Sequence, residues 1–269
     1  MTNRWHGRIY NLGSRLADPA ACAEYRAKGY TDVCALVISS ERPLYNNPPY
    51  DFLKNPDGFL ERVQRYADAG LRCIPVIGFE GNKPAQQRYG STWLSHVRAF
   101  VRATRDHPAI TCYAPGLEVG EWTDGDGLLD MMAVISFECD HPIVPHFNGA
   151  EWGPSSDGKL RWSGGQRRFW ETAQSRCPNT RFAVGFQARH VSRANGGFGP
   201  VEKDAIGHMS GLGSLLLPGR LGGLGIGVIW WEGFFNGRDP VANVAPEAEA
   251  RAFGKRMIAL GYLGSMNGV

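Results

Sequence analysis

Two glutamates lie at the ends of strand-like stretches, one rich in glycine and the other in tryptophan. A carboxylate at such a position can take part in acid and base chemistry. Glu118 lies near the end of the stretch 111–119, and Glu232 follows Trp230 and Trp231 at the end of the stretch 226–232. If the two strands share one rim, the two carboxyl groups can face each other across a cleft. Cleavage of a glycosidic bond needs such a pair, with one protonated acid for the leaving oxygen and a second carboxylate as nucleophile or base. An apolar, partly desolvated pocket keeps the first of them protonated.

Further side chains suited to a sugar follow other predicted strands. Tryptophan faces stack on sugar rings, whereas amides and carboxylates bind hydroxyl groups. The candidate substrate-binding residues are Glu121, Trp122, His146, Asn148, Glu151, Trp152, Gln187, His190, Trp230 and Trp231. Glu121, Glu151 and Glu80 are alternatives for either member of the catalytic pair.

Apolar runs alternate with helical patterns from one end of the chain to the other. The predicted strands are 8–12, 32–39, 72–78, 111–119, 143–147, 181–186 and 226–232, and the predicted helices are 19–28, 58–69, 92–106, 127–138, 165–175, 201–217 and 246–260. Such alternation predicts an α/β fold with a parallel sheet. We expect one catalytic domain over 1–269, a (β/α)8 TIM-type barrel in which seven strands are clear. An eighth strand lies within 211–224, or the ring is irregular and has seven.

An open doubly wound sheet is the alternative architecture. It is disfavoured because Gly13 stands alone after the first predicted strand, where a dinucleotide-binding sheet would carry a GxGxxG motif. Loop lengths favour the barrel. The helix-to-strand links are short, whereas the strand-to-helix links 40–57, 80–91, 149–164, 187–200 and 233–245 are long and rich in polar and aromatic residues. All of the long links leave strand C-termini, the face on which barrel enzymes carry their active sites.

The segments Gly116-Leu117-Glu118 and Trp230-Trp231-Glu232 resemble motifs of a clan of (β/α)8 glycoside hydrolases. In that clan a glutamate ending strand four is the acid/base, and a glutamate ending a late strand is the nucleophile. The resemblance implies these roles for Glu118 and Glu232, with a poly- or oligosaccharide as substrate. Many members carry Asn before the strand-four glutamate, where this chain has Leu117. The Gly-x-Glu form is also similar to cellulase-like domains of bacteriophage tail and lysis proteins.

Composition narrows the partners, the compartment and the cofactors that we expect for this chain. A net charge of +3 is too small to indicate nucleic acid, and the sequence lacks an unbroken apolar stretch long enough for a membrane span. The N-terminus lacks the apolar segment of a secretory signal, so we expect a chain that is cytoplasmic as made and then virion-associated or released. The six cysteines lack zinc-site spacing and are expected to be buried free thiols, and we expect neither a metal nor an organic cofactor.

Two other functions fit some of these residues. A non-catalytic carbohydrate-binding barrel of a virion or cell surface would keep the aromatic rim and need no paired acids. A lyase or isomerase would use His146 or His190 as its base.

Overall fold

A computed structural model describes residues 5–11, 19–27, 31–38, 50–78, 86, 88–115, 125–144, 164–187, 189–192, 197–200 and 220–228. Strands and helices alternate along these residues, as the sequence predicts. Their bounds are β1 Trp5–Asn11, α1 Pro19–Ala27, β2 Asp32–Leu36, α2 Pro56–Asp68, β3 Arg72–Val76, the 3-10 turn η2 Gly90–Thr92, α4 Trp93–Thr104, α5 Gly125–Glu138, α6 Gly164–Arg176, β4 Phe182–Gln187, β5 Arg189–Ser192, β6 Gly197–Pro200 and β7 Leu221–Val228. The predicted helices 201–217 and 246–260 lie outside the described residues.

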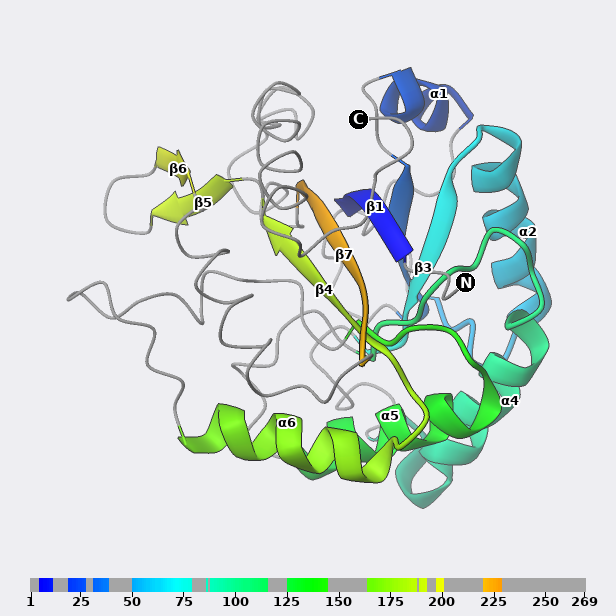
Figure 1. The fold of residues 1–269 in the computed structure, drawn as a ribbon. Helices are drawn as coiled ribbons and strands as arrows, with labels where there is room; N and C mark the ends of the chain where they lie inside the picture. The colour runs from blue at the N-terminus through cyan, green and yellow to red at the C-terminus, as the bar shows by residue number, and fades with distance from the viewer. Residues whose placement is uncertain are drawn as a thin grey trace.

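Seven parallel segments close into a ring, and α2, α4, α5 and α6 lie outside it on one side (Figure 1). Five of them form one sheet in the order β3-β2-β1-β7-β4, in which every pairing is parallel. Two short segments, 110–114 and 143–144, complete the ring between β3 and β4. Parallel bridges make these joins at Cys73–Ile110, Val76–Ala114, Tyr113–Ile143 and Ile143–Phe182. The predicted α/β barrel is therefore present, and its described segments close with seven strands.

β7 differs from the sequence prediction at its start. The prediction began the last strand at 226 and kept 211–224 for an eighth strand, but Leu221–Val228 is one continuous strand. It pairs with β1 on one side and with β4 on the other, so the described ring leaves no place for a strand between β4 and β7. Glycine has a low preference for β-strands, so this stretch shows only a weak strand pattern in the sequence. Hydrogen bonds to the neighbouring strands on both sides stabilise β7 in spite of that low preference. Residues 229–232 of the predicted strand lie outside the described part of the chain.

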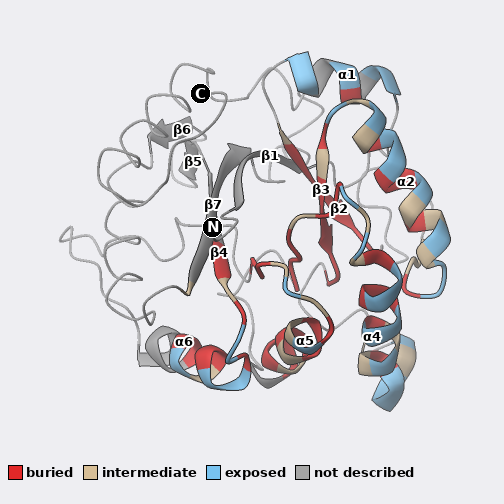
Figure 2. Cartoon of the chain, turned by 45° about the vertical axis from the view of Figure 1, so that its right-hand side comes forward, coloured by how far each residue is buried: buried red, intermediate tan, exposed pale blue. Residues whose placement is uncertain are grey.

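α2 shows how the helices cover the ring. Its buried residues Phe59, Arg62, Val63 and Tyr66 recur at the spacing of one helix face. The helix starts two residues earlier than predicted, because the Asn55 side chain accepts a hydrogen bond from the Gly58 N–H at 3.0 Å, and Pro56 fits the first turn. On both α2 and α4 the buried side faces the strands and the exposed side faces outward (Figure 2).

The described links confirm the predicted asymmetry of the barrel. α2 ends at Asp68 and β3 begins at Arg72, with Gly70 in the left-handed region at φ 76° between them. In the other direction the chain runs from Leu36 at the end of β2 to Pro56 at the start of α2. This longer link leaves the C-terminal end of its strand, as the sequence predicts.

The stretch 187–200 was predicted as a loop and contains a hairpin instead. β5 and β6 pair antiparallel, with His190 opposite Gly199. The hairpin follows β4 directly and lies beyond its end (Figure 1). Asn195-Gly196, a dipeptide favoured in hairpin turns, stands between the two strands in the sequence. None of the helices in the described part of the chain is long and apolar enough to cross a membrane.

Candidate active site at the C-terminal rim of the barrel

Most of the predicted site residues fall outside the part of the chain that the structure describes. They are Glu118, Glu121, Trp122, His146, Asn148, Glu151, Trp152, Trp230, Trp231 and Glu232, together with the alternative Glu80. The backbone places two others. Gln187 ends β4 in register with Gly227 of β7, and His190 lies on β5. The roles predicted for all of these residues stay predictions, and the structure contributes the strands that lead to them.

The segments that precede the two predicted catalytic glutamates lie on opposite walls of the ring. The segment 110–115 ends three residues before Glu118, and β7 ends at Val228, four residues before Glu232. Around the ring, β1, β2 and β3 separate these walls on one side, and the segment 143–144 and β4 separate them on the other. Because all seven segments are parallel, their C-terminal ends meet at one rim. The chain therefore leaves for Glu118 and for Glu232 from opposite sides of the same barrel mouth.

The interior of the ring is lined by small and medium apolar side chains. They form a cluster separate from the core under the helices, and its members are Cys34, Leu36, Ile74, Val76, Cys112, Ala114, Val144 and Ala183. Side chains alternate along a strand, so paired positions of neighbouring strands share a face. Ala183 is paired with Gly223, which places Gly223, Gly225 and Gly227 at the inner positions of β7. The wall that leads to Glu232 therefore adds no side chains of its own to the barrel interior at these positions.

An ion pair lies at the opposite end of the interior. Asp32, the first residue of β2, is fully buried, and its Oδ2 lies 2.7 Å from Nη2 of Arg72, its register partner on β3. The Thr31 hydroxyl donates a second hydrogen bond to the same oxygen at 2.5 Å. Asp32 alternates with Cys34 and Leu36 on the inner face, so this pair lies at the N-terminal floor of the barrel.

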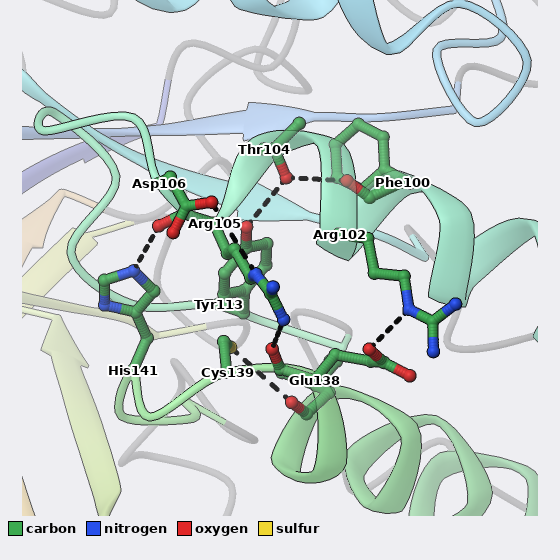
Figure 3. Close-up of polar contacts among 10 residues, drawn as sticks. Phe100, Arg102, Thr104, Arg105, Asp106, Tyr113, Glu138, Cys139 and His141 are labelled. Atoms are coloured by element: carbon green, nitrogen blue, oxygen red, sulfur yellow. Dashed lines mark hydrogen bonds and ion pairs between the residues drawn. The ribbon is translucent and has the colours of Figure 1, made fainter.

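Polar contacts between α4, α5 and the segment 110–114 reinforce the floor (Figure 3). Glu138, almost fully buried at the end of α5, accepts from Arg102 Nε at 2.7 Å and lies 3.1 Å from Arg98 Nε. Tyr113 shares a 2.7 Å hydrogen bond with Thr104 at the end of α4. The Glu138 contacts join the end of α5 to α4, and the Thr104 contact joins the end of α4 to the segment 110–114, on the side away from the mouth. We therefore assign them to the stability of the fold, the usual role of this face in barrels.

Residues 50–55, within the predicted link 40–57, form a turn at the mouth, which we call the rim turn. It returns beside β2, where Asp51 bridges to Ile38 and the Phe52 N–H donates to the Val37 carbonyl at 2.9 Å. Asp51 accepts hydrogen bonds from Arg88 Nη1 at 2.8 Å, from the Tyr89 hydroxyl, and from the Leu53 N–H at 3.1 Å. The rim turn is thereby tied to the segment that precedes α4, so two of the long strand-to-helix links are joined at the rim.

A buried arginine lies behind the rim turn. The Arg62 guanidinium is 4.8 Å from the ring centroid of Tyr50 and 4.5 Å from that of Phe52. Burial raises the pKa of Tyr50, and the positive charge and hydrogen bond of Arg62 partly oppose that shift. A sequence signal for this arrangement existed, because Arg62 occupies the apolar stripe of α2 between Phe59 and Val63. A charged residue at a core position of a helix indicates a partner inside the protein.

The cysteines offer no nucleophile at the mouth. All six are free, and only Cys139 is more than marginally exposed. Burial raises the pKa of the thiols at Cys34, Cys73, Cys112 and Cys177, and raises that of Cys139 to about 11. Thiols are far less reactive than thiolates, so at neutral pH these groups are inert. In the described ranges, no group of three or more His, Cys, Asp or Glu side chains could hold a metal ion.

This burial predicts a thiol titration with two clear levels. At pH 8 a colorimetric disulfide reagent should modify at most Cys139 within minutes in the folded protein, and six thiols after unfolding in guanidinium chloride. The Cys139→Ser variant serves as the control and should show no fast-reacting thiol. Rapid modification of a second thiol in the folded protein would contradict the burial described here.

The ring of parallel strands with helices outside defines the chain as an α/β barrel, and comparison with solved structures agrees. No protein-family model and no curated protein sequence matches the chain. The structures that it resembles are (β/α)8 glycoside hydrolases, at low sequence identity.

One of these structures is a GH5-4 broad specificity endoglucanase from an uncultured bacterium, with a TM-score of 0.52, 10% identity and coverage of 94% of both chains. A second is described as a glycoside hydrolase, with a TM-score of 0.51, 11% identity and coverage of 95% of this chain and 70% of the other. A GH5_18 protein from Bifidobacterium longum subsp. infantis has a TM-score of 0.49, 11% identity and coverage of 96% and 80%. At these identities the likeness to the first two structures shows the fold alone.

Proposed function

We propose that this chain is a glycoside hydrolase, with one catalytic domain over 1–269 that cleaves a poly- or oligosaccharide. Glu118 acts as the acid/base and Glu232 as the nucleophile. The observation that carries the proposal is the closed parallel ring, in which the segments leading to these two glutamates end at the same rim on opposite walls. Two carboxylates that approach a sugar from opposite sides are the arrangement that glycosidic cleavage requires.

The chemistry assigned to the pair has two steps. In the first, protonated Glu118 gives its proton to the glycosidic oxygen while a Glu232 oxygen bonds to the anomeric carbon and the leaving sugar departs. In the second, Glu118 takes a proton from water, which attacks the anomeric carbon and releases Glu232. The anomeric configuration is retained, and this outcome requires the two carboxyl groups to lie about 5 Å apart. Proton NMR of the first product formed, before mutarotation, reads the configuration directly.

The similar solved structures guide the choice of first substrates. One of them is named as a broad specificity endoglucanase. We therefore place β-glucans at the head of the candidate glycans for this chain, followed by bacterial wall and capsule glycans. The candidate aromatic residues Trp122, Trp152, Trp230 and Trp231 would supply stacking surfaces for the sugar rings.

A glycan screen tests the proposal. The purified chain is incubated with plant β-glucans and with bacterial wall and capsule polysaccharides, and new reducing ends are measured over time. We expect time-dependent release from at least one glycan, without added metal or cofactor. If a glycan in the gel slows the migration of the folded chain but no glycan releases reducing ends, the carbohydrate-binding barrel replaces the hydrolase as the proposed function. Neither binding nor release would remove both functions.

A further inference from the structure

We infer that Tyr50 is a sugar-contacting residue of the proposed site, an aromatic platform on the β2–β3 side of the barrel mouth. This inference rests on the proposed function, and it adds a residue that is not among the candidate site residues predicted from the sequence. Three observations carry it, namely the position of the ring over the barrel interior, the contacts that fix the ring, and the nature of its neighbours.

The position of Tyr50 comes first. Its ring packs against the cluster that lines the inside of the barrel and lies apart from the larger core under the helices. Its backbone lies at the C-terminal rim, because the next residue, Asp51, bridges to Ile38 just beyond β2. The side chain is partly exposed. A tyrosine that covers the inner apolar cluster from the rim and keeps exposed surface lies at the bottom or the wall of the barrel mouth.

The contacts of the rim turn fix the ring in place. The ring centroid of Phe52 lies 5.0 Å from the ring centroid of Tyr50. The Arg62 guanidinium lies 4.8 Å from the same Tyr50 centroid. Arg62 itself is only 7% exposed, so it cannot swing away into solvent. On the other side of the backbone, Asp51 is held by Arg88 and Tyr89. A platform that is rigid before binding loses little conformational entropy when a sugar stacks on it.

The surroundings of the ring suit a neutral sugar. Its neighbours on the inner side are apolar, and the Arg62 guanidinium beside the Tyr50 and Phe52 rings is almost fully buried. Aromatic faces bind the C–H surfaces of pyranose rings, and the tyrosine hydroxyl can exchange hydrogen bonds with sugar hydroxyls. Tyr50 lies in the rim turn beside β2, which stands between β1 and β3 in the ring, to one side of the line that joins the two walls leading to the glutamates. It is therefore placed to hold a sugar unit beside the bond that is cut.

The experiment compares two substitutions of the same ring. Tyr50→Leu keeps an apolar cover on the inner cluster but removes the flat face, whereas Tyr50→Phe keeps the face. We expect Tyr50→Leu to raise KM about fivefold to tenfold with kcat within about twofold, and Tyr50→Phe to recover most of that loss. Arg62→Met tests the positioning role of the guanidinium and should raise KM less, with kcat unchanged. Phe137→Leu, at a 78% exposed aromatic on α5, is the control and should leave KM unchanged.

Binding without turnover separates this inference from the proposed function. In the Glu118→Gln chain, retardation in gels that contain each glycan of the screen reports affinity, and adding Tyr50→Leu should weaken that affinity about fivefold to tenfold. If the wild type cleaves a glycan while Tyr50→Leu keeps its KM and its retardation, the platform is overturned and the hydrolase stands. If the wild type binds but cleaves nothing and Tyr50→Leu weakens binding as expected, the platform stands and the hydrolase is overturned. If the wild type neither binds nor cleaves, both are overturned.

Discussion

Replacement of Glu118 or Glu232 by glutamine is expected to abolish glycan cleavage while the fold is kept. Glutamine has nearly the same size and shape as glutamate, but it can neither donate a proton to the leaving oxygen nor attack the anomeric carbon. Acid and base catalysis by one positioned side chain contributes about a hundredfold to ten-thousandfold, so kcat should fall by at least that range in each variant. The measurement is the rate of new reducing ends on the most susceptible glycan of the screen.

The two variants should also differ from each other. Glu118 must be protonated to assist the leaving group, so Glu118→Gln should remove the alkaline limb of the pH–rate profile. A substrate with a good leaving group, such as an aryl glycoside, needs little help from an acid and should recover part of the Glu118→Gln loss. No such recovery is expected for Glu232→Gln, because the bond to the enzyme cannot form.

A matched control variant shows whether these losses of activity are specific to the two candidate catalytic positions. Glu171→Gln makes the same chemical change at an exposed position on α6 and should leave kcat and KM unchanged. Thermal unfolding of all three variants should match that of the wild type. Full activity in both Glu118→Gln and Glu232→Gln would remove the assigned mechanism, and loss in only one of them would direct attention to Glu121, Glu151 or Glu80 as its partner.

The second large effect is expected in the helix layer, at Trp170. This side chain is fully buried on α6, with its ring 5.6 Å from Phe182 and 5.5 Å from Phe169 between centroids. Phe182 begins β4, the strand beside β7, so Trp170 fastens α6 to the wall next to the one that leads to Glu232. Truncation of a buried Trp to Ala removes its transfer free energy and leaves a cavity. Trp170→Ala should therefore lower the free energy of unfolding by about 3–5 kcal/mol.

Denaturant unfolding measures that loss, and two further variants calibrate it. Trp170→Phe retains most of the buried volume and should cost clearly less than the alanine variant. Phe137→Ala truncates an exposed aromatic on α5 and should change the free energy of unfolding by less than about 0.5 kcal/mol. Below the unfolding transition, kcat of Trp170→Ala should stay near that of the wild type, because its described ring contacts lie within α6 and at the N-terminal start of β4. An equal cost for Trp170→Ala and Phe137→Ala would contradict the packing described here.

The helices and strands with a clear hydrophobic period could be predicted from the local sequence alone. The strand predicted to start at 32 and the one predicted to start at 72 begin at Asp32 and Arg72, and helix 127–138 ends at Glu138 as expected. The alternation of strand and helix also fixed the barrel class, and the short links fixed which end is the floor. These features depend on residues near one another in the chain, so their spacing is visible in the sequence.

The sequence by itself determined the α/β alternation, the elaborate C-terminal rim and the list of side chains able to act on a sugar. Only the tertiary structure decided how the ring closes, because the pairing of glycine-rich β7 with β1 and β4 depends on backbone hydrogen bonds between segments far apart in the chain. Tertiary structure likewise placed Tyr50 over the barrel interior. Its position is set by Arg62 on the following helix and by Arg88 and Tyr89 before α4, and contacts across such separations leave no periodic trace in the order of the residues.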